Sequence, residues 1–329
     1  MARNATEEDF AVRSLALLVF AALACAAARA EFPEHPVRLI VPQAAGSATD
    51  TIARLLAAEL PGKLGQPVVV ENRPGGALTI GINLVAKAAP DGYTVGMGPI
   101  GALAITRHMV SKLPYDIERD LQPIALVVRS HLLLAVSPSL PVRSVRELID
   151  YARKNPGKLL NASSSNGSPG HVGGELFKYM TGTDIVHVPY KGGSMAINDL
   201  IAGHVQVMFE SLNSIAPYAR SGRVRALAVS GAQRSAGFPE LPTIAEAGVP
   251  GYEAGTWTGV IGPVGLPRPV LARLNAAINQ AIVTPASKKR FDDIGNELGG
   301  GTPEEFGDLI RRESAKWAEV VKRSGAKID

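Results

Sequence analysis

The sequence predicts an α/β protein of two lobes, each with a mainly parallel sheet flanked by helices. Three observations support this fold class. From Val37 onward, short apolar runs alternate with segments of helical spacing. The same alternation returns after residue 158. Two extended, mostly apolar stretches, 127–136 and 256–261, separate the parts of the chain.

The first half repeats one unit: strand, loop, helix. A strand at 37–41 leads through a loop of small residues into Ile52, Leu55, Leu56 and Leu60, which follow helical spacing. The next elements are a strand at 68–70, a loop at 73–76, a helix at 80–88 and a strand from residue 93. Such alternation indicates βαβ units and therefore parallel strands.

The second half shows the same order. The expected strands are 158–162, 185–188, 205–209 and 224–229, the loops 163–169 and 190–193, and the helices 174–179 and 195–201. Residues 70–76 and 188–193 occupy equivalent places, since each contains a strand end, a basic residue and a glycine pair before a helix. This internal correspondence predicts two lobes of similar architecture.

We expect the chain to pass between the lobes near residues 133 and 255. Lobe 1 then comprises 31–132 and 256–329, and lobe 2 is the insertion 133–255. The last part returns to lobe 1 as helices at 270–282 and about 304–324. Thr302, Pro303, Glu304 and Glu305 mark the start of the last helix with a cap, a first-turn proline and acids beside the helix dipole.

The N-terminus resembles a secretory signal peptide, residues 1–30. Residues 14–28 form an uncharged run rich in Leu and Ala, Arg13 precedes it, and Ala28 and Ala30 offer small residues for cleavage. The mature protein would begin at Glu31 in the periplasm. The acidic residues of 7–9 are unusual before such a run, so translation from Val12 is a second hypothesis.

Composition excludes several classes of function. Hydrophobic residues make up 46% and charged residues 19%, which is typical of a globular protein. The single cysteine, Cys25, lies in the predicted signal, so we expect no disulfide, thiol nucleophile or cysteine metal site. The sequence contains no run of Lys and Arg residues, so we do not expect nucleic-acid binding. The six histidines lack paired ligand spacing, and we expect neither metal nor cofactor.

The loops after the strands are the candidate binding elements. In open parallel sheets, ligands bind beyond the carboxyl ends of the strands, where helix N-termini present free N–H groups to anions. The loops 43–50, 74–77 and 163–168 are small and polar. Each alone is typical of a connector or helix cap, but three in equivalent places favour a site. His171 could donate to a ligand carboxylate or cap its own loop.

Two segments superficially match enzyme motifs. Residues 96–101 form a G-x-G-x-x-G, but no acidic residue closes a second strand at the required distance, so we expect a tight turn there. Residues 192–196 approach a nucleophile elbow around Ser194, but the one later histidine, His204, follows after only ten residues. We therefore expect no catalytic residues and no enzyme; an esterase-type activity is the weakest alternative.

The chain resembles, over nearly its whole length, the substrate receptors of tripartite tricarboxylate transporters, the Bug or TctC family. The matching segments are 32–42, 65–75, 89–94, 174–177, 187–193, 226–229 and 242–248. The resemblance implies a type II-like periplasmic binding protein that closes a cleft between its lobes on a small carboxylate and delivers it to membrane permease subunits. It also implies capture by backbone amides and water. Closing one cleft needs one chain, so we expect a monomer.

This chain departs from the family pattern at the expected cleft. Gln43 replaces an aromatic residue, Ser47 replaces a glycine, Ala77 and Leu78 replace a glycine pair, and Glu210 stands where Asp is common. We therefore expect a changed pocket, and a sensor that presents the solute to a sensor kinase is the alternative function. The predicted ligand-binding residues are Gln43, Ala44, Ala45, Gly46, Ser47, Asp50, Gly75, Gly76, Ala77, Leu78, Ser163, Ser165, Asn166, Ser168, His171, Tyr190, Lys191, Gly192 and Glu210.

Overall fold

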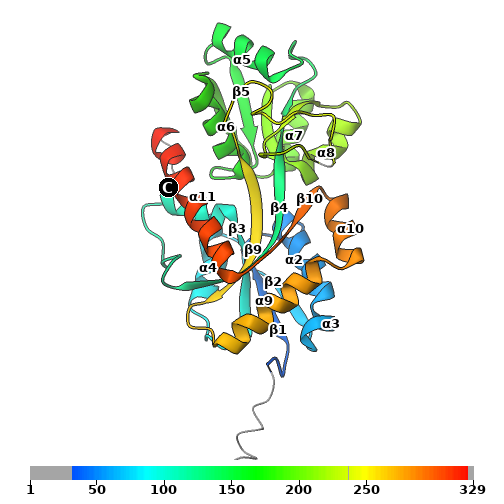
Figure 1. The fold of residues 1–329 in the computed structure, drawn as a ribbon. Helices are drawn as coiled ribbons and strands as arrows, with labels where there is room; N and C mark the ends of the chain where they lie inside the picture. The colour runs from blue at the N-terminus through cyan, green and yellow to red at the C-terminus, as the bar shows by residue number, and fades with distance from the viewer. Residues whose placement is uncertain (1–31, 236, 325–329) are drawn as a thin grey trace, which may run out of the picture.

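The computed structural model describes residues 32–235 and 237–324. Figure 1 shows two lobes, one above the other, with helices on the outside of each, which confirms the predicted two-lobed α/β fold. The predicted signal peptide lies outside the described residues. Within the described part of the chain, no helix combines the length and apolarity needed to cross a bilayer.

Lobe 1 is built on a mixed sheet. Its parallel part is β1 (Val37–Val41) between β2 (Val68–Asn72) and β3 (Thr94–Pro99). Strand β9 (Gly255–Pro263) then pairs antiparallel with β3 and with β4 (Leu121–Val136), and β10 (Asn296–Gly300) pairs antiparallel with β4. The apolar residues of β1 are fully buried, as expected for a strand covered on both faces.

Lobe 2 repeats this plan. Strand β5 (Leu159–Ser163) pairs parallel with β6 (Ile185–Pro189) and β7 (Val207–Ser211), whereas β4 pairs antiparallel with β7 and β8 (Arg225–Val229). In both lobes the prediction of parallel pairing therefore holds for the βαβ part and fails beyond it. The reason is that the strands joining the lobes run opposite to their neighbours.

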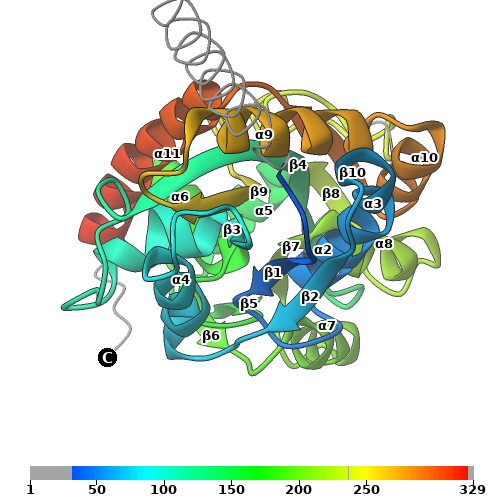
Figure 2. The ribbon, with the colours of Figure 1, turned by 90° about the horizontal axis from the view of Figure 1, so that it is seen from below.

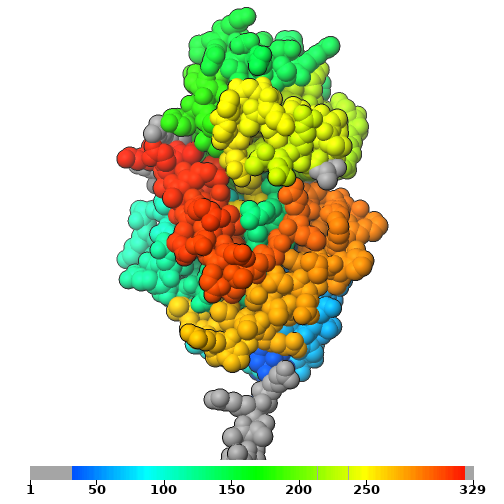
Figure 3. Space-filling view, in the orientation of Figure 1, coloured from blue at the N-terminus to red at the C-terminus, as the bar shows by residue number. Residues whose placement is uncertain are grey.

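Strand β4 belongs to both lobes. Through His131 it pairs with β9, and from Leu132 onward it pairs with β7 and β8, so all the strands form one continuous ten-stranded sheet. In Figure 3, residues of β4 are visible at the waist of the molecule between α11 and α10. On this basis we propose the lobe limits expected above, 31–132 with 256–329 and 133–255.

The helices cover the outer faces of the sheet. Figure 2 shows α9, α10 and α11 along one side of the molecule, and α4 and α7 on the opposite side. The α-helices are α2 (Ala48–Glu59), α3 (Pro61–Leu64), α4 (Thr79–Ala86), α5 (Val145–Lys154), α6 (Pro169–Thr181), α7 (Gly193–Ala202), α8 (Leu212–Arg220), α9 (Arg268–Ile282), α10 (Pro285–Asp293) and α11 (Pro303–Ser324). Short turns are η1 (Gly76–Leu78), η2 (Gly101–Ile105) and η3 (Thr106–His108).

The start of α11 follows the predicted signals. The Glu305 amide donates to Thr302 Oγ1 at 3.2 Å, and the Glu305 carboxylate accepts from the Thr302 amide at 2.8 Å, which is a capping box. Phe306 and Trp317 of this helix are fully buried, and the Phe306 ring meets Trp257 of β9 edge-on at 5.6 Å. Burying each such side chain stabilises the fold by about 2–3 kcal/mol.

The G-x-G-x-x-G segment is not the tight turn expected from the sequence. Gly96 and Gly98 lie inside β3, and Gly101 begins η2. Cβ atoms at Gly96 and Gly98 would collide with Val85 and Leu103 of the core. These glycines are therefore required for close packing over the sheet.

Candidate functional site

A cavity of about 810 Å³ lies between the lobes. Both lobes and the strands that join them line it. Its volume is in the range of small-molecule sites. Two helices from opposite lobes begin at its walls, because the caps of α2 and α6, Ser47 and Ser168, both line the cavity.

The loop between β1 and α2 is held from behind by Asp50. Asp50 is 2% exposed, and its carboxylate accepts from the Gly46 amide at 2.8 Å, from Asn72 Nδ2 at 2.9 Å and from Arg54 Nε at 2.9 Å. Asn72 Nδ2 also donates to the Gln43 carbonyl at 3.0 Å. Burial raises the pKa of Asp50, but these hydrogen bonds outweigh it and hold that pKa below its usual range. Asp50 thus orders the loop from inside.

The second loop of lobe 1, between β2 and α4, has two residues in a backbone conformation that favours glycine although both carry side chains. Ala77 and Leu78 have φ of 51° and 77°, in the left-handed region. This conformation costs a residue with a side chain about 1–2 kcal/mol. Both residues line the cavity, and the Leu78 side chain also packs on the core near Gly101. The side chains narrow the space that glycines would leave open.

The lobe 2 loop, 164–168, faces these lobe 1 loops across the cavity. Ser168 caps α6 by accepting from the His171 amide at 3.3 Å. His171 turns to its own loop, since its Nδ1 accepts from the Gly167 amide at 3.1 Å, which is the second of the two arrangements left open by the sequence. Ser163, at the end of β5, donates its hydroxyl to the Ser165 carbonyl at 2.9 Å.

Lobe 2 contributes one more helix start, at Gly192 and Gly193. Tyr190, just before it, donates its hydroxyl to Asp199 of α7 at 2.6 Å; burial and this carboxylate raise the Tyr190 pKa to about 12. Lys191 is exposed to solvent. Gly192 caps α7 with φ of 148°, a value that requires glycine.

Glu210 is the charged side chain of the cavity wall. It lies at the end of β7, is 7% exposed, and accepts from the Ser211 amide at 2.9 Å. A Cβ at Gly193 would be 3.2 Å from Glu210 Oε2, so the carboxyl lies at the start of α7. Burial raises the Glu210 pKa to about 7, although the Ser211 hydrogen bonds act in the opposite direction.

The structure brings part of the predicted set to the cavity. The predicted residues that line it are Gln43, Gly46, Ser47, Ala77, Leu78, Ser165, Asn166, Ser168, Gly192 and Glu210. Those that lie behind or beside the lining are Ala44, Ala45, Asp50, Gly75, Gly76, Ser163, His171, Tyr190 and Lys191. Whether either group contacts a solute stays a prediction.

Sequence reasoning missed the wall formed by the joining strands. Lining residues from this wall are Val128, Ser130, Thr256, Trp257, Thr258 and Asn296. Pro99, Ile100, Gly101 and Thr106 from lobe 1, and Ser211, Ser214 and Tyr218 from lobe 2, were also not predicted. The polar residues in the otherwise apolar crossover stretches, Ser130, Thr256 and Thr258, were the available signal.

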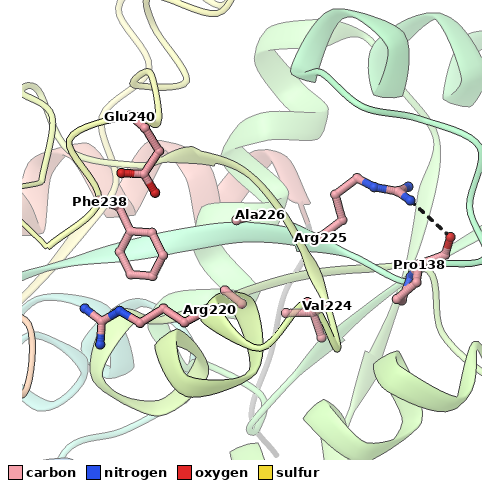
Figure 4. Close-up of a pocket in the computed structure, with 9 residues that line it drawn as sticks. Pro138, Arg220, Val224, Arg225, Ala226, Phe238 and Glu240 are labelled. Atoms are coloured by element: carbon pink, nitrogen blue, oxygen red, sulfur yellow. Dashed lines mark hydrogen bonds between the residues drawn. The ribbon is translucent and has the colours of Figure 1, made fainter.

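A second hollow lies on the outside of lobe 2 (Figure 4). It measures about 540 Å³ and contains no predicted site residue. The guanidinium group of Arg220 lies 5.0 Å from the centre of the Phe238 ring, and that of Arg225 donates to the carbonyl groups of Leu140 and Val142. These cationic groups already have partners within the fold, so this hollow is a weaker candidate.

The serine and the histidine of the elbow-like segment lie at opposite ends of α7. Ser194 lines the cavity at the start of α7, whereas His204 follows the end of that helix, is largely exposed and pairs with Asp199 at 3.3 Å. In residues 32–235 and 237–324, no group of three or more His, Cys, Asp or Glu side chains could hold a metal ion.

Comparisons with known proteins agree with this architecture. The chain is 40% identical over 291 residues to the UPF0065 protein in the tcbD-tcbE intergenic region of Pseudomonas sp. strain P51, covering 88% of this chain and 86% of that protein. It is similar to two solved structures, R. palustris Rpa4515 with adipate (TM-score 0.82, 40% identity, 91% and 100% coverage) and MatC (Rpa3494) from Rhodopseudomonas palustris with bound malate (TM-score 0.78, 33% identity, 88% and 100% coverage).

The profile of one family matches most of the chain. Residues 52–326 match the TctC family, described as the tripartite tricarboxylate transporter family receptor. Members of this family are periplasmic solute-binding receptors and not enzymes. The fold, the interlobe cavity and this match together show that the chain belongs to the TctC family of periplasmic solute-binding receptors.

Proposed function

We propose that this protein captures a small carboxylate-bearing solute between its lobes and delivers it to the permease subunits of a tripartite tricarboxylate-type transporter. The observation that carries the proposal is the chemistry of the cavity wall. Helices α2, α4, α6 and α7 all begin at the cavity, and each helix N-terminus offers free N–H donors and a partial positive charge.

The described lining residues include no Lys, Arg or His. An anion bound there would be held by backbone amides, by the hydroxyls of Ser47, Ser165 and Ser168, and by water. Helix N-termini bind carboxylates in this way without a cationic side chain. Charge-assisted hydrogen bonds of this kind contribute about 1.5–3 kcal/mol each, so several of them together would supply much of the binding free energy.

The structures of two relatives support the ligand class. One contains adipate and the other malate, and both molecules are dicarboxylates. The narrower pocket expected from Leu78 and the amide of Gln43 favour a different dicarboxylate or related acid in this chain. Replacing both residues, Gln43→Phe with Leu78→Gly, should change the order of ligand affinities; an unchanged order would contradict this role.

Delivery to a permease requires export, and residues 1–30 supply the proposed signal peptide. The two lobes surround a complete cavity within one chain, which supports a monomer. The permease partner is inferred from the family alone.

The test is thermal unfolding of residues 31–329, refolded to remove any co-purified solute, against matched acids and their uncharged amides. A ligand at 100 times its dissociation constant adds about 2.7 kcal/mol to the unfolding free energy, a shift of several degrees. Stabilisation by carboxylates and not by their amides is the expected result. Equal stabilisation by acids and amides, or none by any acid, would overturn the proposal.

A further inference from the structure

Two histidines are stacked behind the lobe 2 capture loop, defined here as residues 164–168. The rings of His171 in α6 and His187 in β6 lie 3.7 Å apart with 10° between their planes. His171 is 5% exposed and His187 is half-buried. Neither lines the cavity, whereas every residue of the capture loop does. The pair therefore supports the cavity wall from the protein side.

The hydrogen bonds assign a proton to one nitrogen of each ring. The Gly167 amide donates to His171 Nδ1 at 3.1 Å, so Nδ1 carries a lone pair and the proton is on Nε2. Ser163 uses its one hydroxyl proton for the Ser165 carbonyl at 2.9 Å. The 2.7 Å contact between Ser163 Oγ and His187 Nε2 is therefore donated by His187.

These bonds connect two residues of the capture loop, Ser165 and Gly167, to the histidine pair. The Gly167 amide is tied to His171, and the Ser165 carbonyl is tied through Ser163 to His187. Both backbone groups are thereby used on the protein side. The hydroxyls of Ser165 and Ser168 and the side chain of Asn166 remain at the cavity wall.

Both rings are neutral in this arrangement. Burial, the neighbouring His187 and Lys178 lower the His171 pKa to about 3, and burial and Lys178 lower the His187 pKa to about 4. Neutrality agrees with the geometry, since a protonated His171 would have no lone pair for the Gly167 amide, and two stacked imidazolium ions would repel each other.

We propose that His171 and His187 are positioning residues that hold the capture loop in its solute-binding conformation through their hydrogen bonds to Gly167 and Ser163. The inference rests on the proposed function, because one of its tests measures the affinity for a carboxylate solute. It explains why His171, although it does not line the cavity, lies at the first turn of the helix that begins there.

Paired substitutions separate the hydrogen bonds from the packing. In His171→Asn, the amide oxygen can take the place of Nδ1 and accept from Gly167, whereas His171→Phe keeps a stacked ring without an acceptor. In His187→Gln, the amide nitrogen can take the place of Nε2 and donate to Ser163, whereas His187→Phe cannot donate. The matched control is His35→Phe, because His35 stacks on Tyr93 at 3.6 Å at the surface of lobe 1, away from the cavity.

Affinity is measured by titration calorimetry with the acid of the thermal panel, malate, adipate or another dicarboxylate, that most stabilises the stripped wild-type protein. We expect His171→Phe and His187→Phe each to weaken binding at least about tenfold, since each leaves a buried polar group without its partner. We expect His171→Asn, His187→Gln and His35→Phe to bind within about threefold of wild type. Phenylalanine variants with wild-type affinity, or variants without rescue by Asn and Gln, would overturn the proposal.

A second measurement needs no ligand. Hydrogen–deuterium exchange of the unliganded protein should show the Gly167 amide protected in wild type and His171→Asn, and exchanging at least about tenfold faster in His171→Phe. Equal protection in all three proteins would overturn the inference. If no acid binds the wild type, the proposed function fails while this exchange experiment still decides the role of His171.

Discussion

Replacing Glu210 by glutamine should remove a specific pH dependence of stability. Burial raises the pKa of Glu210 in the folded protein to about 7, against 4.5 for an unperturbed glutamate. The folded state therefore keeps its proton to higher pH than the unfolded chain does. The resulting stabilisation is complete below pH 4.5 and is lost as the pH rises through 7. A difference of 2.5 pH units corresponds to about 3 kcal/mol.

The assay is urea unfolding of the unliganded wild type and Glu210→Gln at pH 4.5, 6 and 8. The wild type should lose about 3 kcal/mol relative to the variant between the lowest and highest pH. His171 and His187, whose lowered pKa values reduce stability on acidification, are present in both proteins and cancel in the difference. Glu240→Gln, at an exposed position of lobe 2, is the control and should show no such change. A difference between wild type and Glu210→Gln that stays constant with pH would refute the reasoning.

Four further substitutions, three of them with a matched control, test the loops and their packing. Ser47→Ala and Ser168→Ala each remove a helix cap, so each should lower the unfolding free energy in urea by about 1 kcal/mol and should also weaken solute binding. The control Ser144→Ala removes the cap of α5 away from the cavity, so it should lower the unfolding free energy by a similar amount and leave the affinity unchanged. Gly170→Ala should lower the melting temperature strongly, since the added Cβ would collide with the Phe209 carbonyl. The control Gly62→Ala, in another helix with open space around the residue, should be neutral or slightly stabilising. Equal effects of the two substitutions would contradict the packing argument. Ala77→Gly should raise the melting temperature by about 2–4 °C by relieving the positive φ, and a decrease would show that the loop is not strained.

Local signals in the sequence predicted the local structure well. The capping box at Thr302 and Glu305 and the equivalent strand–loop–helix units in both lobes appear in the structure as expected. These features depend on neighbours within a few residues, which a single sequence displays. The direction of β4 and β9 could not be predicted in this way, because it depends on partners more than 100 residues distant, and the sheet is therefore more mixed than expected.

In the candidate site, too, local features could be predicted from the sequence and contacts between distant residues could not. The loops that follow strands were found from their composition, but the roles of individual side chains were not. Asp50 was expected at the ligand and is directed to Gly46, Asn72 and Arg54 inside its loop. His187 of β6 is linked to the capture loop through Ser163 of the neighbouring strand β5. Such pairings follow from tertiary packing and have no local sequence signal.

The shared strand β4 also affects the order in which the chain can fold. Its lobe 1 partners β9 and β10 are synthesised long after it, from residues 255 and 296 onward, and the whole of lobe 2 lies between. Lobe 2 can complete its own sheet first, from a continuous segment that contains β5, β6, β7 and β8. Contacts so distant along the chain slow folding, because the closure entropy of the long loop opposes them until the sheet forms. We therefore expect lobe 1 to close last, after lobe 2 has formed and after the C-terminal strands have been made.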